Sequence, residues 1–277
     1  MNLTPFTALT WAYQLHYYLC FRTHRRRTLF SYEPHWNLLG KLIEEISANH
    51  NYRLLEQKSY STQLRCLLSL RPSQTVSKAV QLLKSNSSRE LARAFGLSVP
   101  VWAAGYLARS SGSVRISAVR EYLEEQPTHH GYDSRVLPPV YRFRVSQPQL
   151  LRAPHAAFDL SHHLVLSTQH RKGVFGASIG EVLTDYWLSV ARKREFALDQ
   201  ISIVPDHIHM IVRTMPKNSI EEVALMLMNN GQYFIGERYP ELLVQLRMTQ
   251  LWNPSAYAGT CGQITTGLIM KWLQSDE

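Results

Sequence analysis

Two histidines separated by a single residue, His207 and His209, form the sharpest chemical signal in this sequence of 277 residues. They lie in the run 205–212 (PDHIHMIV), whose apolar character is typical of a β-strand. Side chains two residues apart on a strand project from the same face, so the two imidazoles are expected side by side. Such a pair can hold a divalent cation, although structural histidines on a strand produce the same pattern.

A second signal is Tyr122, which lies in a run with helical character, 119–126 (VREYLEEQ). Tyr122 and Gln126 are four residues apart and therefore share one face of a helix. A phenol placed in this way can act as a nucleophile, and the amide oxygen can act as a ligand. Taken alone, the two residues are better explained as a half-buried tyrosine and a solvent-facing glutamine. The neighbouring Arg120 and Glu121 are expected on a solvated helix face.

The sequence repeats itself, and the repeat indicates which elements carry these residues. Three blocks of the first half align without gaps over three blocks of the second half, in the same order. The aligned blocks are 13–30 (YQLHYYLCFRTHRRRTLF) over 158–175 (FDLSHHLVLSTQHRKGVF), 62–72 over 206–216, and 102–126 over 252–276. The chain is therefore predicted to hold two copies of one fold.

Each half is predicted to contain strand, helix, strand, strand, helix, strand and helix, in that order. In the second half, strands are expected at residues 159–168, 198–204, 207–214 and 251–259, and helices at 178–194, 219–239 and 265–274. Ser219 followed by Glu222 is a capping-box pattern, which marks the start of a helix. Consecutive strands that pair antiparallel, with helices on one face, indicate an α+β fold of the ferredoxin-like type.

A proline-rich stretch without a sustained hydrophobic period, residues 127–157, is predicted to link the two copies. The first domain then spans residues 1–126 and the second spans residues 158–277.

The composition is globular and basic. The formal net charge is +9 and the isoelectric point is about 9.5, which favours an anionic partner such as nucleic acid. No window approaches the roughly 18 uncharged apolar residues of a membrane span. The apolar opening stretch is followed by a basic cluster without a cleavage site, so no signal peptide and a cytoplasmic location are expected. Cys20, Cys66 and Cys261 lack metal spacing and are expected to be reduced packing residues.

The sequence resembles the HUH single-tyrosine transposases, which move insertion sequences as single-stranded DNA and include relatives associated with repetitive extragenic palindromes. The resemblance covers residues 12–126 and 158–277. It rests on the segments 158–172 and 252–262, the strand 206–212 with its histidine pair, and the helix that holds Tyr122. It implies two ferredoxin-like (RRM-like) HUH domains, fused in tandem as a pseudo-dimer.

The resemblance also implies a site and a reaction. His207, His209 and Gln126 are expected to bind Mg²⁺ or Mn²⁺, and Tyr122 is expected to attack a DNA phosphodiester. The implied product is a 5′-phosphotyrosine bond, from which strands are rejoined without ATP. The implied partner is single-stranded DNA, with hairpin ends, in the nucleoid. A single chain is expected to suffice, although a higher assembly stays open.

Each half lacks what the other keeps. The first half has Gln63 and Arg65 where the second has the histidines, and the second has Trp272 and Asp276 where the first has the tyrosine and the glutamine. The family's active sites combine the histidines of one subunit with the tyrosine helix of the other. Complementary loss therefore leaves one composite site and one degenerate site per chain. The halves are expected to pack about a pseudo-twofold axis, with the helix 113–126 over the sheet of the second half.

Basic turns follow the first strand of each half and are the expected contacts for the DNA backbone, although an ordinary solvated loop has the same composition. The residues are Arg22, Arg25, Arg26 and Arg27 in the first half and His170, Arg171 and Lys172 in the second. Arg65, in the place of a metal ligand, either holds a phosphate or fills the vacated position. Trp102 and Trp252 are expected in the core.

Two other functions fit parts of the sequence. A domesticated protein that binds hairpin DNA or RNA without catalysis would also show degraded sites, but it has no reason to keep Tyr122 together with the histidine pair. A structural metal-binding protein that does not bind nucleic acid would leave the basic turns without a role.

Overall fold

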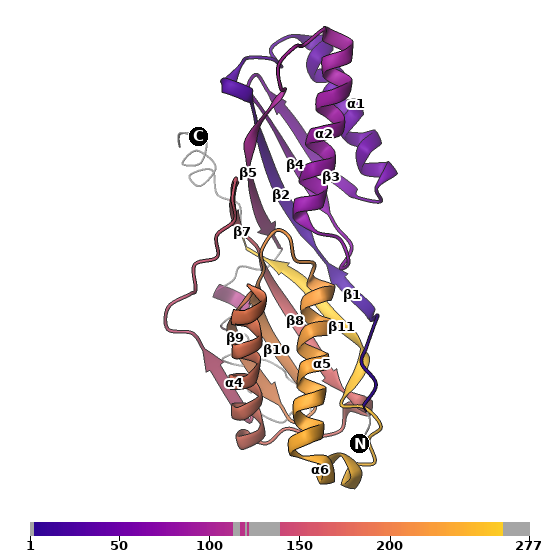
Figure 1. Cartoon of the computed structure of the whole chain (residues 1–277), viewed down its shortest axis with the longest axis vertical. Coiled ribbons are helices and arrows are strands. Elements are labelled where there is room, and N and C mark those ends of the chain that lie inside the picture. Colours follow the sequence, from indigo (N-terminus) through magenta and orange to yellow (C-terminus); the bar gives the residue numbers. More distant parts are fainter. Residues whose placement is uncertain (1–2, 113–116, 120, 122–138, 263–277) are drawn as a thin grey trace.

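Two sheets lie end to end along the long axis of the molecule, and helices cover one face of each (Figure 1). The computed structural model describes residues 3–112, 117–119, 121 and 139–262. Within this part of the chain, no helix is both long enough and apolar enough to cross a membrane. Both halves thus have the α+β architecture that the sequence predicts.

The first sheet has five strands in the order β3-β4-β2-β5-β7. The strands are β2 (His16–Thr23), β3 (Arg53–Tyr60), β4 (Gln63–Ser69), β5 (Trp102–Ser111) and β7 (Ala156–Asp159). One face is covered by α1 (Glu33–Asn49) and α2 (Val76–Phe95), and the short helix η1 (His24–Arg26) follows β2. Alternate residues of β4, Leu64, Cys66 and Leu68, are buried in the core.

The second sheet has six strands in the order β1-β11-β8-β10-β9-β6. The strands are β1 (Thr10–Gln14), β6 (Tyr141–Arg144), β8 (Ser161–Thr168), β9 (Ala197–Val204), β10 (His207–Arg213) and β11 (Trp252–Cys261). The helices are η2 (Gln169–Arg171), α4 (Ala177–Arg194), α5 (Ile220–Arg238) and α6 (Pro240–Gln245). The α5 helix begins with the predicted capping box between Ser219 and Glu222.

The two halves exchange a strand. Although β1 precedes β2 in the chain, it pairs parallel with β11 in the second sheet, while β7 pairs parallel with β5 in the first. The registers are equivalent: Trp11 lies opposite Ala256, and Tyr106 lies opposite Ala156. Each sheet is therefore completed by a strand of the other half, as the pseudo-twofold arrangement requires.

Hydroxyl groups at equivalent positions bind the backbone where the strands cross. The Ser110 hydroxyl donates to the Cys261 carbonyl at 2.5 Å and accepts from the Ser161 amide at 3.0 Å. In the same way, the Thr260 hydroxyl donates to the Ser111 carbonyl at 2.6 Å and accepts from the His16 amide at 3.0 Å. Because each hydroxyl satisfies backbone groups on two strands, it ties the crossing together.

Two residues at equivalent positions of the repeat, Tyr17 and His162, meet each other at the junction. The Tyr17 hydroxyl lies 2.8 Å from His162 Nε2, and both side chains are buried. Burial raises the pKa of Tyr17 and lowers the pKa of His162 to about 4, so the contact is between neutral groups. A contact between equivalent residues places them at the pseudo-twofold axis.

The predicted elements within the described residues agree with the structure, but β1, α6 and the strands around the linker were not predicted. Within residues 127–157, the structure has β6, which extends the second sheet next to β9, and the first two residues of β7. A four-residue alternating run such as YRFR is too short for the sequence pattern to separate from a loop. Trp102 and Trp252 are in the core, and the three cysteines are free and buried. The predicted helix 265–274 lies outside the described residues.

Removing either junction hydroxyl should destabilise the protein. We expect Ser110→Ala and Thr260→Val each to lower the free energy of unfolding by about 1 to 3 kcal/mol, because the backbone groups they satisfy lose a partner. Urea unfolding measures the effect. Ser98→Ala, at an exposed position, is the control and should change stability by less than about 0.5 kcal/mol. Junction variants as stable as this control would contradict the role of the hydroxyls.

His162 should make stability depend on pH. Its pKa is lowered from 6.5 to about 4, so between these values the unfolded chain binds a proton that the folded chain does not. The free energy of unfolding should therefore fall as the pH drops through this window, by up to about 1.4 kcal/mol per pH unit. In urea unfolding measured at several pH values, His162→Gln should reduce the dependence of the unfolding free energy on pH by the contribution of about one proton. An unchanged slope would show that another group is responsible.

Candidate functional site

His207 and His209 lie on the face of the second sheet that is turned away from α4 and α5. The intervening and following residues of β10, Ile208 and Met210, are fully buried in the core under the helices. The two imidazole rings are 4.8 Å apart between centroids, at an interplanar angle of 69°. The predicted side-by-side placement of the pair is thus present.

The ring of His207 is held through its Nδ1 atom. This atom lies 2.6 Å from Oδ1 of Asp206, and Oδ2 of the same carboxylate accepts from Nε of Arg171 at 2.8 Å. Burial lowers the pKa of His207, while the hydrogen bond to Asp206 opposes this shift. With Nδ1–H donated to a carboxylate, Nε2 carries the lone pair that a metal ion requires.

A third histidine, His163 on β8, contacts the pair. Its Nε2 atom lies 3.0 Å from Nδ1 of His209, and the two rings are stacked at 5.3 Å between centroids and 17° between planes. Burial lowers the pKa of His163 to about 4. His163 was not among the predicted site residues. The signal was available, because His163 lies in an aligned block and Tyr18 occupies its position in the first half.

Part of the first half contacts the same face. Val119 is buried in a cluster with Ile211 of β10 and Cys261 of β11. Ile211 shares its face of β10 with the two histidines, since it follows His209 by two residues. Val119 is three residues before Tyr122 in the sequence. Tyr122, Gln126, Trp272 and Asp276 themselves lie outside the described residues, so their predicted roles stay predictions.

The equivalent face of the first sheet has different chemistry. Gln63 and Arg65 take the positions of the histidines, as the alignment predicts, and Thr62 takes that of Asp206. Oε1 of Gln63 accepts from the Cys20 thiol at 3.4 Å, while the Arg65 guanidinium lies 4.4 Å from the centroid of the Tyr60 ring. Burial raises the pKa of Cys20 to about 12, opposed by Arg65 and Arg22. This face carries a guanidinium group where the second half has an imidazole.

The two basic turns have the same backbone. Arg25 and Arg26 in η1, like His170 and Arg171 in η2, have positive φ angles of 52° to 55°. The side chains of these four residues are exposed, as a contact with a DNA backbone requires. In each turn a threonine hydroxyl at the end of the preceding strand donates to a carbonyl at 2.7 Å and fixes this shape.

Three other residues predicted to contact DNA are engaged within the protein. Arg22 is 5% exposed. Arg27 donates to the carbonyls of His24 and Pro100. Lys172 donates to the carbonyls that follow α6, at 2.5 Å and 3.0 Å. Contacts of these three with DNA stay predictions. The four exposed residues, of which Arg171 also pairs with Asp206, are more accessible to DNA.

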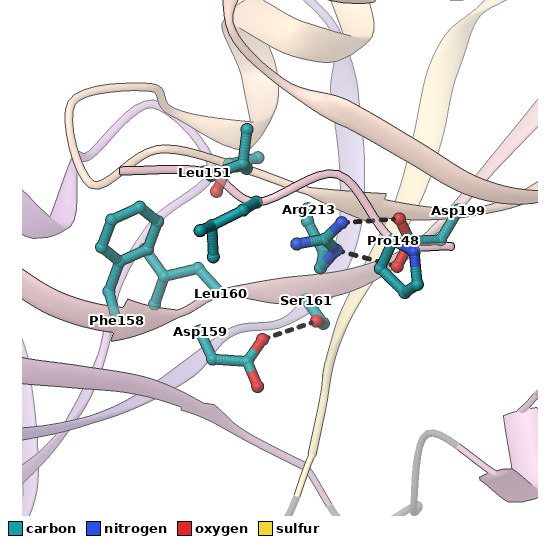
Figure 2. Close-up of a pocket in the computed structure, with 10 residues that line it drawn as sticks. Pro148, Leu151, Phe158, Asp159, Leu160, Ser161, Asp199 and Arg213 are labelled. Carbon is teal, nitrogen blue, oxygen red and sulfur yellow. Dashed lines mark hydrogen bonds and ion pairs between the residues drawn. The ribbon is translucent and has the colours of Figure 1, made fainter. Parts of the chain in front are cut away.

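A cavity of about 360 Å³ lies at the far end of β10 from the histidines (Figure 2). Arg213 in its wall forms a two-point ion pair with Asp199, with distances of 2.8 Å and 3.0 Å. It also donates to the Gln149 carbonyl at 2.7 Å. The charge of Arg213 is therefore compensated by Asp199. The hydrogen bond to Gln149 holds the chain segment that leads into β7. The cavity does not belong to the histidine site.

Among the described residues, no cluster of three or more histidine, cysteine, aspartate or glutamate side chains is placed to hold a metal ion. The histidine pair still fits a cation, because the Nδ1 atom of each ring is hydrogen-bonded on the side away from Nε2. A third protein ligand would have to be of another residue type or come from outside the described residues. Gln126 satisfies both conditions.

A family model described as "Transposase IS200 like" matches residues 11–126 and 156–276. The chain belongs to the IS200-like transposase family. As a family member it is assigned to the DNA transposases. The two matched segments correspond to the two halves of the internal repeat, as expected for a tandem pseudo-dimer.

Relatives in this family are about the length of one half. The chain is 25% identical over 118 residues to the ISDra2 transposase TnpA of Deinococcus radiodurans. The aligned residues cover 43% of this chain and 84% of the relative. It is 20% identical over 126 residues to the transposase of insertion sequence IS200 from Salmonella typhimurium, covering 44% and 83%, respectively.

Two solved structures are also similar. The first is a transposase from Deinococcus radiodurans, with 21% identity and a TM-score of 0.38, covering 45% of this chain and 96% of that one. The second is a REP-associated tyrosine transposase bound to a REP hairpin, with 13% identity and a TM-score of 0.30, covering 48% and 75%.

The basic turns should contribute charge to DNA binding without contributing to stability. We expect Arg25→Ala and Arg26→Ala each to weaken binding of single-stranded DNA and to reduce the slope of log affinity against log salt by about 0.7. Fluorescence anisotropy at several salt concentrations measures this slope. Lys193→Ala removes the same charge from the exposed side of α4 and should leave the slope unchanged. Equal slopes for all three variants would contradict a contact at the turn.

Proposed function

We propose that this family member is a metal-dependent transposase that cuts and rejoins single-stranded DNA at one composite site per chain. The histidine pair of the second half and Tyr122 with Gln126 of the first half make up that site. The observation that carries the proposal is the contact of Val119 with Ile211 and Cys261. It brings the chain segment that precedes Tyr122 onto the face of the sheet that holds the histidines.

Complementary loss supports the same assignment. The first half has replaced both histidines, together with the aspartate and the third histidine that contact them in the second half. The second half has replaced the tyrosine and the glutamine. Independent decay of the two halves would not be expected to spare one complete set.

In the proposed reaction, Mg²⁺ or Mn²⁺ held by His207, His209 and Gln126 would polarise the scissile phosphate and offset its growing negative charge. The Tyr122 hydroxyl loses its proton as its oxygen attacks phosphorus. The bond to the 3′ oxygen breaks, and that oxygen takes up a proton and leaves as a 3′-hydroxyl. A 5′-phosphotyrosine bond results. Attack by a 3′-hydroxyl on this bond reverses the step and rejoins strands, since one phosphodiester replaces another.

The DNA substrate is proposed from the family and from the charge of the chain. A relative of known structure is bound to a REP hairpin, and we extend a folded single strand to this protein as its substrate class. The net charge of +9 and the exposed residues of both basic turns favour contacts with its phosphates. Arg171 donates to Asp206 and so places one basic turn beside the histidine pair.

Tyr122→Phe should abolish covalent attachment to DNA while leaving DNA affinity nearly intact, because only the phenol oxygen is removed. The measurement is a denaturing gel of protein incubated with single-stranded hairpin DNA and Mn²⁺. His207→Ala should also abolish the adduct. Trp272→Phe is the matched control at the equivalent position of the second half, and it should form the adduct at the wild-type level.

An adduct that persists in Tyr122→Phe, or that maps to Tyr257 beside His163, would show that the nucleophile is a different tyrosine. Wild-type protein that binds the hairpin tightly but forms no adduct with Mg²⁺ or Mn²⁺ would favour a domesticated binding module over a transposase.

A further inference from the structure

We infer that His163 is a positioning residue that fixes the tautomer of His209, so that His209 presents Nε2 to the cation. The inference rests on the proposed function, because it assigns a role within the same metal site. It concerns a residue on a different strand, β8, that the proposed ligand set does not contain.

The hydrogen bond between the two rings carries one proton. Nε2 of His163 and Nδ1 of His209 are 3.0 Å apart, a distance at which one nitrogen donates and the other accepts. If His163 were the donor, neutral His209 would keep its own proton on Nε2 and could not bind a metal through that atom. If His209 donates Nδ1–H, its Nε2 carries a lone pair. A functional site therefore requires His163 to be the acceptor.

The neighbouring ligand follows the same rule. Nδ1 of His207 contacts the Asp206 carboxylate, which can only accept when it is ionised. His207 is thereby fixed with its proton on Nδ1. Two partners of different chemistry, a carboxylate and an imidazole, would thus leave the Nε2 lone pair of each ring for a cation.

His163 is poorly placed to be a third ligand itself. Its Nε2 atom is turned toward His209 within hydrogen-bond distance, and the two rings are stacked with only 17° between their planes. Metal ligands direct their lone pairs at the ion, whereas these two nitrogens are directed at each other. The geometry is that of a supporting hydrogen bond.

The first half provides an internal comparison. Tyr18 stands at the position of His163, and among the described residues its buried hydroxyl has no hydrogen-bond partner. The fold therefore accepts a bulky side chain here without requiring a hydrogen bond. The histidine is present only in the half that has a histidine pair to position.

The tautomer can be observed directly in the full-length protein. Long-range ¹H–¹⁵N NMR spectra of ¹⁵N-histidine-labelled protein report which ring nitrogen of His209 is protonated, and calorimetric titration with Mn²⁺ reports the affinity of the site. We expect the Nδ1–H tautomer in the wild type. In His163→Phe we expect a mixture of tautomers and an affinity for Mn²⁺ lower by about 10- to 100-fold.

His163→Gln tests for rescue, because a glutamine side-chain oxygen reaches about as far as the imidazole Nε2 and can accept the same hydrogen bond. It should restore the Nδ1–H tautomer and most of the affinity. Tyr18→Phe, at the equivalent position of the first half, is the matched control and should change neither. If His163→Phe fails to fold, the glutamine variant compared with His163→Leu makes the same test.

The inference would be overturned if spectra of the wild type showed His209 protonated on Nε2. It would also be overturned if a folded His163→Phe protein kept the wild-type tautomer and affinity. These outcomes are distinguishable from failure of the proposed function. If the wild type forms the covalent adduct and binds Mn²⁺ but His163→Phe does so equally well, only the role of His163 is lost. If the wild type binds no Mn²⁺, the proposed metal site is wrong.

Discussion

The exchange of edge strands between the two halves holds the molecule together. β1 completes the sheet of the second half and β7 completes the sheet of the first, both in parallel and in equivalent registers. An unpaired sheet edge exposes a row of donors and acceptors, so each half supplies what the other lacks. The hydroxyl bonds of Ser110 and Thr260 and the contact between Tyr17 and His162 depend on this exchange. It fixes how the first half approaches the face that carries the histidines.

Much of the fold follows from patterns that are local in sequence. Alternation along β10 separates Ile208 and Met210, which enter the core, from His207 and His209, which leave it. Because the halves align, an element predicted in one half is expected at the same position in the other. The alignment also reveals that the histidines are replaced in only one copy. The capping box at Ser219 shows that even a helix boundary can be explicit when a specific hydrogen bond defines it.

The remaining features depend on partners that are distant in sequence. The strand β1 was not predicted, and a local alternating pattern contains no information about which sheet edge a strand joins. The same limit applies to β6, whose partner β9 lies more than fifty residues away. His163 illustrates this limit at the site. Alternation predicts which face of β8 it lies on, but its contact with His209 on β10 exists only in the assembled sheet. The clue was comparative, since Tyr18 stands at its position in the first half.

The exchange of strands also changes how the proposed composite site would respond to dilution. Two separate chains that share an active site come apart as their concentration falls, because association is bimolecular and follows mass action. Here both halves belong to one polypeptide, and each half adds an edge strand to the sheet of the other. Assembly of the site is then part of folding, with an effective concentration set by the chain itself. Under the proposed assignment, formation of the site would therefore not depend on protein concentration.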